Sequence, residues 1–464
     1  MSEPRVNFAP RLRASERVVV HVDSPAARWI GALAVLSVFC WLILLLTHDH
    51  DRDWQAAGRL AWSLTILTAI ALIARGIFLG RPVTAAHAGL ALVAMLAGLG
   101  AHVLVFDLLG NLLIVSAGAV SMWPTTARPN STDLHRIWAL VDATKGDPLA
   151  PFAMQDQKCY HFNDDGTAAV AYRTRMGYAV VSGDPIGDET RFAELVADFA
   201  AMCHARGWRM VVLGSSQRRV DLWADATMLG QTLRAVPVGR DVVIDVATFD
   251  MVGRKYRNLR QAVQRTQNFG ITTEVVSERG LDGRLLAELT EVLRASPSGA
   301  RTERGFSMCL DGALEGSYPG VKLIIARDRL GRVQGFHRYA TAGNGSEVSL
   351  DVPWRRRGAP NGIDERLSVD MIAWARDNGA ERLSLAFAAF PEIFTDKNRG
   401  KISSLIYTAI HLGDALIALE SLYRYLRKFH ALGDRRYVMA SLTQILPLLV
   451  VLLSLEFMPR RRRL

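Results

Sequence analysis

The stretch from residue 347 to 376 holds the residues best suited to chemistry, because an acid, a basic loop and a helix start follow one another. It reads EVSLDVPWRRRGAPNGIDERLSVDMIAWAR. We predict a strand that ends at Asp351, where a carboxylate would face a cleft at the strand's carboxyl edge. It could hold the ammonium group of a charged donor or orient an attacking hydroxyl. The alternative is a turn-forming aspartate before Pro353.

The basic loop and the helix start add candidates of their own. Arg356 and Arg357 could grip a phosphate, or they could belong to a solvated or lipid-facing patch. Asn361 has the pattern of a helix N-cap, with Asp364 at the third helical position as a capping-box variant. A helix N-terminus also attracts anions, so Asn361 and Asp364 could serve both the cap and a binding site.

A second basic signature lies near the C-terminus, where LYRYLRKF is followed by RRY. We predict that Lys428 lies on an amphipathic helix, with Arg435 and Arg436 shortly after it. A lysine and an arginine would complement the charge of a phosphodiester acceptor. The alternative is a basic helix that lies on an anionic membrane.

A third basic segment, GRKYRNLRQAVQR, spans residues 253–265. It carries Arg254, Lys255, Arg257 and Arg260 on a predicted helix. Such a helix could contact a nucleic-acid backbone, which proteins recognise by charge and shape. It could equally bridge two lobes and face acidic residues. Two acidic residues in short motifs are weaker candidates: Asp184 in GDPIG and Glu303 in ERGFSM.

Several kinds of site are not indicated. The four cysteines are scattered without CxxC spacing, so the sequence predicts neither a zinc site nor a disulfide framework. The run HDHDRD at residues 48–53 is interpreted as a polar loop tip rather than a metal site. The sequence has no GxSxG motif and no obvious cysteine with a partnered histidine, so it does not indicate a covalent nucleophile.

Around these candidates the chain alternates short β-branched runs with helical periods, which predicts an α/β or α+β layered fold. The expected strands are 168–172, 177–181, 209–213, 272–276, 321–327, 334–340, 347–351 and 382–386. The expected helices are 194–206, 253–265 and 361–378. Two consecutive units of similar size emerge from this pattern.

The first quarter of the chain is compatible with a membrane. Apolar segments run over 29–46, 60–79, 83–106 and, more briefly, 108–123. A span needs about 20 apolar residues, so we expect three to four helices. Arginines precede the first segment and flank the second, which places the N-terminus and the region after residue 123 in the cytoplasm. We therefore expect a multi-pass protein of the cell membrane, with an apolar, arginine-ended tail at 441–464 that associates with the membrane.

The charge of the chain agrees with an anionic partner. Its net charge is +10 and its sequence pI is about 9.7, which favours anionic lipid headgroups, nucleic acid or phosphorylated substrates. Half of the residues are hydrophobic and the mean hydropathy is +0.13, values that fit a membrane part joined to a soluble part.

Taken in order, GDPIG, the basic helix, ERGFSM, SLD with APNG, and LYRYLRKF with RRY resemble the synthase domain of aminoacyl-phosphatidylglycerol synthases, the MprF-type family. The resemblance covers residues 131–440. It implies two tandem acetyltransferase-like (GNAT-like) lobes that use aminoacyl-tRNA as donor and esterify the headgroup of phosphatidylglycerol, with no cofactor. The family's S-x-D pattern falls on Asp351, and its K-F and R-Y pattern falls on Lys428 and Arg436.

With this resemblance the chain divides into residues 1–125 as a transmembrane anchor, 126–270 as a first lobe, 271–440 as a second lobe that carries the site, and 441–464 as the tail. The expected catalytic residues are Asp351, Asp364 and Lys428. Residues 352–354 and 385–388 depart from the family pattern, so the amino acid, lysyl or alanyl, and the lipid remain open. Two alternatives remain: an acyl-CoA-dependent N-acyltransferase, because residues 355–360 loosely match the GNAT phosphate loop, and a non-catalytic lipid- or tRNA-binding membrane protein.

Overall fold

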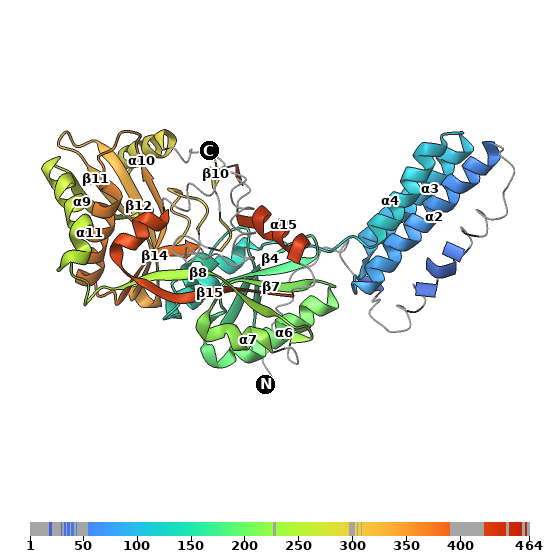
Figure 1. Cartoon of the computed structure of the whole chain (residues 1–464), viewed down its shortest axis with the longest axis horizontal. Coiled ribbons are helices and arrows are strands. Elements are labelled where there is room, and N and C mark those ends of the chain that lie inside the picture. Colours follow the sequence, from blue (N-terminus) through green and yellow to red (C-terminus); the bar gives the residue numbers. More distant parts are fainter. Residues whose placement is uncertain are drawn as a thin grey trace.

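The structure is a computed structural model that describes most of the chain. The described residues are 18–20, nine positions between 29 and 43, 54–225, 229–296, 302–303, 305–307, 309–389, 422–441, 445–456 and 460–461. Helices α2 (Trp54–Phe78), α3 (Ala85–Val103) and α4 (Asp107–Ser121) lie side by side at one end of the molecule, and a large sheet with its covering helices forms the other end (Figure 1).

Two helices of this bundle are long and apolar enough to cross a membrane, judged by length and composition alone. They are Leu60–Phe78 within α2 and Ala85–Val103, each of 19 residues. At about 1.5 Å per residue, 19 residues extend about 28 Å, close to the roughly 30 Å of a hydrocarbon core. Helix α4 has 15 residues and falls short of this length. Of the expected first span at 29–46, nine of the 18 positions lie outside the described residues.

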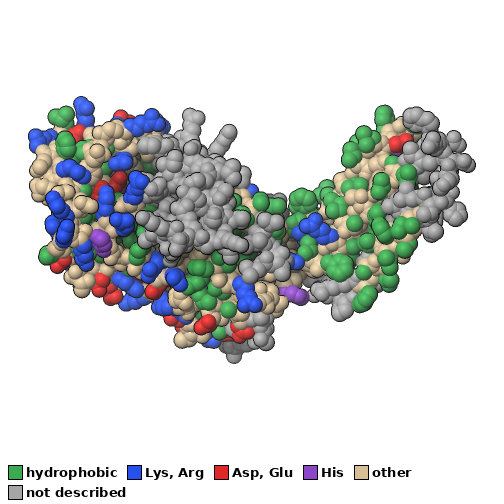
Figure 2. All heavy atoms as spheres, in the orientation of Figure 1, with side chains coloured by type: hydrophobic (Ala, Val, Ile, Leu, Met, Phe, Trp, Pro, Cys, Tyr) green, Lys and Arg blue, Asp and Glu red, His purple; other side chains and the backbone are tan. Residues whose placement is uncertain are grey.

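Small residues allow the helices of the bundle to approach closely. A Cβ added at Gly118 of α4 would lie 2.8 Å from the carbonyl oxygen of Ala69 in α2. A Cβ at Gly98 of α3 would lie 2.9 Å from the side chain of Ile114. Close backbone approach of this kind is typical of helices that pack without a hydrophobic driving force in lipid. Hydrophobic side chains also cover the outward surface of the bundle (Figure 2).

In the described part of the chain, one 12-stranded sheet organises the rest of the molecule. Its order is β3-β4-β5-β7-β15-β8-β14-β13-β12-β11-β9, with β6 beside β4. The strands are β3 (Cys159–Phe162), β4 (Ala168–Arg175), β5 (Tyr178–Ser182), β6 (Ile186–Gly187), β7 (Arg209–Ser216), β8 (Arg234–Asp245), β9 (Thr272–Ser277), β11 (Val321–Arg327), β12 (Val333–Ala342), β13 (Glu347–Arg355), β14 (Arg382–Ala389) and β15 (Leu432–Ala440). Outside this sheet, β1 (Val18–Val20) pairs with β2 (Val83–Thr84), and β10 (Thr302–Glu303) pairs with β16 (Arg460–Arg461).

Two pairs of neighbouring strands in the large sheet are parallel, and each pair is connected through a helix. Strands β5 and β7 are linked through α6 (Phe192–Ala205), and β13 and β14 are linked through α11 (Ile363–Asp377). The expected strands are all present with ends moved by a few residues, and the expected helix at 253–265 becomes a short 3₁₀ turn, η6 (Arg254–Tyr256), followed by α9 (Arg257–Asn268). The mixed α/β architecture predicted from the sequence is confirmed.

The two halves of the sheet exchange strands. Strand β8 pairs with β14, while β15, which comes late in the chain, inserts between β7 and β8. Neither β8 nor β15 was expected from the sequence. The proposed lobes at 126–270 and 271–440 therefore share one continuous sheet, and residues carried by β15 lie beside strands that come 190 to 227 positions earlier.

Helices cover the sheet on separate faces. Helices α6 and α7 (Val220–Ala224) pack over the strands around β7, whereas α9 and α11 pack over the strands around β13, and α10 (Gly283–Ala295) packs over β12 (Figure 1). Helix α5 (Leu134–Ala143) packs between the two halves. Each helix buries an apolar stripe against the sheet, which is the usual way a layered domain removes hydrophobic surface from water.

The apolar tail forms the 12-residue helix α15 (Ile445–Glu456). One of its faces is buried against the sheet through Leu448, Val451 and Leu455. On the opposite face Leu449 and Val450 are 47% and 58% exposed. A helix of this length extends about 18 Å, which is too short to cross a bilayer. We propose that α15 lies in the membrane interface with this exposed apolar face toward the lipid.

Candidate active site

The candidate site is set by the separation of two parallel strands. Strands β13 and β14 pair only through residues 347–349 and 382–384. Beyond this point β13 continues to Arg355 paired with β12, and β14 continues beside β8. The expectation that the strand ends at Asp351 is therefore wrong. Pro353 fits within β13 because one edge of that strand has no neighbour there.

A segment from the C-terminal part of the chain packs into this opening. Residues 422–426 are helical and are followed by η9 (Arg427–Phe429). Tyr423, Leu426 and Phe429 join the hydrophobic core that lies between the separating strands and α11. This packing fixes the segment, so its polar side chains have defined partners. The Nζ of Lys428 donates a hydrogen bond to Glu365 in the first turn of α11.

A histidine–aspartate pair lies at the same end of α11. The Nε2 of His337, on β12, is 3.3 Å from Oδ1 of Asp364, and Oδ2 of Asp364 is 3.5 Å from Nη1 of Arg355. The His337 side chain is fully buried, and its Nδ1 has no hydrogen-bond partner among the described residues. Burial raises the pKa of Asp364, but the hydrogen bond from His337 and the nearby positive charges outweigh it and lower the pKa overall.

The start of α11 differs from the expected cap. The residue at the N-cap position is Gly362, with φ 101°, and Asn361 is an exposed residue before it. A Cβ at Gly362 would lie 2.7 Å from the carbonyl oxygen of Ala262, so α9 and the left-handed turn together require glycine. Asp364 is thus the second helical residue, where the helix dipole stabilises its negative charge.

Asp351 lies on the other face of the sheet, in a buried ion cluster. Its Oδ2 accepts a hydrogen bond from Nη1 of Arg338 at 2.9 Å, and its Oδ1 accepts one from the backbone N–H of Leu310 at 2.9 Å. Nη2 of Arg338 donates to Glu278 at 2.9 Å. All three charged side chains have 0% exposure. The predicted position at the edge of a cleft is therefore replaced by a closed contact under the loop at residues 309–314.

This cluster contains two carboxylates and one guanidinium, so it carries one excess negative charge when fully ionised. Removing that charge from water is costly, and a bound proton relieves the cost. Burial raises the pKa of Asp351 to about 7, against the opposing effect of Arg338. Asp351 can therefore gain or lose a proton near neutral pH.

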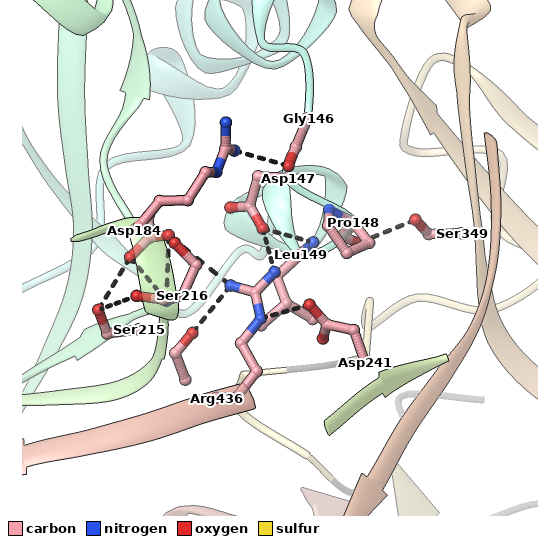
Figure 3. Close-up of polar contacts among 12 residues, drawn as sticks. Gly146, Asp147, Pro148, Leu149, Asp184, Ser215, Ser216, Asp241, Ser349 and Arg436 are labelled. Carbon is pink, nitrogen blue, oxygen red and sulfur yellow. Dashed lines mark hydrogen bonds and ion pairs between the residues drawn. The ribbon is translucent and has the colours of Figure 1, made fainter. Parts of the chain in front are cut away.

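Arg436 organises a second buried cluster where the two halves of the sheet meet (Figure 3). Its guanidinium lies 2.7 Å from Asp147, 2.8 Å from Asp241 and 3.7 Å from Asp184. It also donates to the carbonyl oxygen of Gly214 at 3.0 Å. Asp184, the weaker site candidate in GDPIG, accepts hydrogen bonds from the backbone N–H of Ser216. The strand exchange is what brings Arg436 to these partners.

The Arg436 cluster continues into β13. Ser349 donates a hydrogen bond to the carbonyl oxygen of Pro148 at 2.8 Å (Figure 3), and Glu347 accepts one from the backbone N–H of Gly146 at 3.0 Å. Glu347, Ser349 and Asp351 alternate along β13, where the first two contact residues 146–148 and Asp351 contacts Arg338 and the loop at residues 309–314. The S-x-D motif therefore lies in a polar seam that joins the two halves of the sheet.

Burial also shifts the acids around Arg436. It raises the pKa of Asp241 to about 6, and burial together with Asp147 raises that of Asp184. Three carboxylates share one guanidinium, so proton uptake is again favoured. The role supported by this geometry is to hold the halves of the sheet together, because the buried guanidinium of Arg436 contacts Asp147, Asp184 and Asp241 at once.

A basic cavity lies beside Lys428 at the surface. Its volume is about 490 Å³. It is lined by Lys255, Asn258, Tyr423, Arg424, Arg427, Lys428 and His430. Lys255 and Lys428, which belong to separate basic signatures in the sequence, both line this cavity. Nε2 of His430 also lies 3.0 Å from the carbonyl oxygen of Lys255. Basic side chains gather over this end of the molecule, far from the helical bundle (Figure 2).

The other predicted residues lie outside the opening. Arg356 pairs with Glu291 of α10 at 2.8 Å, and Arg357 is exposed. Arg435 is exposed on β15. Glu303 lies in β10, and its side chain lies outside the described part of the molecule.

The predicted RNA-contacting residues lie near the basic cavity. Arg254, Lys255, Arg257 and Arg260 are all exposed on η6 and the first turn of α9. Arg260 also donates to the carbonyl oxygen of Gly253 at 2.8 Å. Across the described residues, no group of three or more His, Cys, Asp or Glu side chains is placed to hold a metal ion.

Sequence reasoning missed His337, Arg338, Glu278, Asp147 and Asp241. All five depend on contacts between residues 13 to 289 positions apart. One signal was present, since adjacent charged and titratable residues inside a strand are rare unless they have partners on both faces. His337 and Arg338 interrupt the buried β12 in this way.

Comparison with known proteins identifies the family. The model of the phosphatidylglycerol lysyltransferase C-terminal domain matches residues 138–440, about two thirds of the chain. The chain belongs to this family. It is therefore an acyltransferase of the aminoacyl-transferring type, and its mixed sheet has the GNAT-like fold.

Relatives of two kinds accompany this match. An MprF-like domain protein of Mycobacterium tuberculosis is 66% identical over 462 residues, which cover 99% of this chain and 96% of that protein. The lysylphosphatidylglycerol biosynthesis bifunctional protein LysX of Gordonia bronchialis is 28% identical over 352 residues. That match covers 73% of this chain but 30% of LysX, so the chain spans less than a third of that longer relative.

Two solved structures share the fold of the sheet domain. A C-terminal domain (DUF2156) assigned to a lysylphosphatidylglycerol synthetase of Agrobacterium fabrum has a TM-score of 0.59 at 22% identity, covering 70% of this chain and 98% of that one. L-PGS from Bacillus licheniformis has a TM-score of 0.57 at 20% identity, covering 70% of this chain and 96% of that one.

Proposed function

We propose that the protein transfers an aminoacyl group from aminoacyl-tRNA to the headgroup hydroxyl of phosphatidylglycerol or a related lipid. We place the reaction where β13 and β14 separate. The observation that carries the proposal is the basic cavity beside Lys428, which adjoins the polar groups of the opening through the contact between Lys428 and Glu365.

The donor side of the proposal rests on charge. The cavity is lined by four basic side chains and His430, and Arg254, Arg257 and Arg260 are exposed on the adjacent η6 and α9. Nucleic-acid phosphates are bound by positive charge of this kind, with an affinity that falls as salt rises. An RNA acceptor end that enters the cavity would bring its 3′-terminal ester toward Lys428 and the start of α11.

The chemistry needs proton removal and positioning, because the aminoacyl ester is already activated. Asp364 accepts the Nε2–H of His337, which leaves a lone pair on Nδ1. We assign His337 as general base and Asp364 as the residue that orients it. Nδ1 is buried in the free protein, so the proposal requires that substrate entry separate the groups around it. The lipid hydroxyl then loses its proton to Nδ1 and attacks the ester carbonyl carbon. The bond to the ribose oxygen then breaks, and that oxygen takes up the proton, so the step needs no cofactor.

Lys428 and Asp351 support the same step in different ways. Lys428 is about one third exposed at the edge of the cavity, where its charge can stabilise a phosphate or the developing oxyanion. Asp351 has both oxygens occupied by protein donors. We therefore assign it a positioning role, in which it holds the loop at residues 309–314 and Arg338 against β13.

The membrane parts complete the proposal. We propose that α2 and α3 anchor the chain as a multi-pass protein of the cell membrane, with the sheet domain in the cytoplasm where aminoacyl-tRNA is made. The transferred group is lysyl or alanyl. The names of LysX and of the structural neighbours from Agrobacterium fabrum and Bacillus licheniformis support phosphatidylglycerol as the acceptor.

The test is expression of the full chain in a host that lacks aminoacylated lipids, followed by mass spectrometry of the lipid extract. The expected result is a new lipid heavier than phosphatidylglycerol by one aminoacyl residue. His337→Gln should lose this lipid, whereas Arg284→Gln, which changes a 90% exposed arginine on α10, should keep it. An unchanged lipid profile with the chain present in the membrane contradicts the proposal.

A further inference from the structure

A second basic cavity lies at the opposite end of the sheet domain, where the helical bundle joins it. Its volume is about 300 Å³. It is lined by Arg75, Leu79, Arg81, Met176, Gly177, Tyr178, Gly207, Arg209, Pro447 and Val451. These residues come from the end of α2 and the loop after it, from the β4–β5 turn, from the start of β7 and from α15. The proposed transfer site uses none of them.

Three arginines meet in this cavity. Arg75 lies in the last turn of α2, Arg81 lies in the loop between α2 and α3, and Arg209 is the first residue of β7. Within the described part of the chain, none of the three lies within ion-pair distance of a carboxylate. This contrasts with Arg338 and Arg436, each of which has at least two acidic partners.

Arg81 is held in place by contacts that leave part of its guanidinium without a partner. Its Nη1 donates to the carbonyl oxygen of Met122 at 3.2 Å. A Cβ at Gly177 would lie 3.3 Å from its Nη2, and one at Gly207 would lie 2.7 Å from its Cα, so both glycines make room for it. Its Nε is buried and has no hydrogen-bond partner among the described residues.

The local electrostatics favour the binding of an anion. Burial lowers the pKa of Arg81, and the positive charges of Arg75 and Arg209 lower it further. A half-buried guanidinium beside like charges is unfavourable unless an anion compensates it. A phosphate provides the charge and the several acceptor oxygens that three arginines can use.

The position of the cavity selects the kind of phosphate. Arg75 lies about one turn before Phe78, the end of a helix long and apolar enough to span a membrane. A guanidinium at that depth extends toward the headgroup layer. Leu79, Met176, Pro447 and Val451 line the apolar side of the cavity, so both α2 and α15 contribute to it. A diacyl phosphate could therefore place its phosphate among the arginines and its chains along α2 and α15.

We propose that this cavity binds the phosphate of an anionic phospholipid and thereby fixes the sheet domain against the membrane surface. The inference rests on the proposed insertion of α2 into the bilayer and does not require that the bound lipid be the acceptor. The site would hold a lipid even in a protein that cannot transfer an aminoacyl group.

The test uses the full-length protein in nonionic detergent, with bound lipid measured by native mass spectrometry. The probes are dioctanoyl phosphatidylglycerol, dioctanoyl phosphatidylcholine and inorganic phosphate. The wild-type protein should retain phosphatidylglycerol at least about tenfold more tightly than phosphatidylcholine, since a zwitterionic headgroup partly cancels the attraction to the arginines. Millimolar inorganic phosphate should not displace the lipid.

The variant Arg75→Gln/Arg209→Gln should lose most of this preference, Arg209→Lys should keep most of it, and the matched control Arg284→Gln should keep all of it. Thermal melts identify any variant that fails to fold, in which case Arg209→Gln alone replaces the double variant. Asp364→Asn should abolish transfer and retain the lipid, which separates this site from the catalytic proposal. Equal retention of both lipids by the wild-type protein, or an unchanged preference in a folded arginine variant, overturns the inference. Displacement by inorganic phosphate would also overturn it, because it identifies a site for the free ion.

Discussion

The replacement Arg436→Met tests whether the buried Arg436 cluster holds the two halves of the sheet together. Arg436 is 1% exposed, and its guanidinium is the cation shared by Asp147, Asp184 and Asp241. Methionine fills much of the same space but supplies neither charge nor hydrogen bonds. Removing one partner of a buried ion pair costs about 3 to 5 kcal/mol, because it leaves buried charge uncompensated.

The expected change in melting temperature follows from the size of the domain. Unfolding entropy is about 2.1 cal/mol/K per residue, so about 300 residues give roughly 0.6 kcal/mol/K. A loss of about 4 kcal/mol then lowers the melting temperature by about 6 °C. The assay is thermal unfolding of the full chain in detergent, followed by tryptophan fluorescence. Arg435→Met is the matched control. Arg435 is the exposed neighbour of Arg436 on β15, so this replacement should change stability by less than about 1 kcal/mol.

A second variant distinguishes lost charge compensation from lost packing. Adding Asp241→Asn to Arg436→Met removes one of the uncompensated carboxylates, so the double variant should recover part of the lost stability. A melting temperature for Arg436→Met within about 1 °C of the wild type would refute the reasoning. So would a double variant whose loss equals the sum of the two single losses.

Three further predictions concern other parts of the site. Burial raises the pKa of Asp351 to about 7 on folding, above the ordinary value of about 4 for an aspartate. The folded protein therefore keeps a proton that the unfolded chain has released, and stability falls as pH rises from about 4 to about 7. The melting temperature of the wild type minus that of Asp351→Asn should therefore fall over that range, and a difference that rises with pH would contradict the prediction. Gly362→Ala should lower the free energy of unfolding, measured by thermal melts, by about 2 kcal/mol or more. Gly358→Ala is the control, because its added Cβ meets nothing within 4 Å, and it should cost about 1 kcal/mol. Equal costs would show that contact with α9 is unimportant. Lys255→Gln/Arg257→Gln should weaken tRNA binding and reduce the slope of log K against log salt by about 0.7 to 0.9 for each phosphate contact removed. An unchanged slope would exclude these residues from the interface.

The fold was predictable where it depends on local pattern. The short apolar, β-branched run at 321–327 predicted a strand, and the observed strand has the same bounds. The mixed α/β class followed from strands that alternate with helical periods. Strands β8 and β15 escaped prediction because each depends on a partner far away in the chain, and arginines and glycines weaken the local strand signal in both.

The candidate site was predictable only in part, for related reasons. Asp364 and Lys428 were expected to be catalytic, and the structure brings both to the start of α11 through Glu365. The Asn361 cap was wrong, since contact of Gly362 with α9 decided the turn and sequence spacing does not report that contact. Asp351 was recognised by its motif, but its partners Arg338 and Glu278 come from the sheet and the loops around it. Those pairings depend on tertiary contacts and not on local propensity.

The most direct test of the central claim is aminoacyl transfer by the purified full-length chain in phosphatidylglycerol vesicles, with tRNA carrying a radiolabelled lysyl or alanyl group. The account predicts labelled lipid from the wild-type protein. It also predicts a loss of at least about 100-fold in His337→Gln, which removes the proposed general base, with melting temperature and tRNA binding retained. Undiminished transfer by His337→Gln, or no labelled lipid from the wild-type protein with either tRNA, would contradict it.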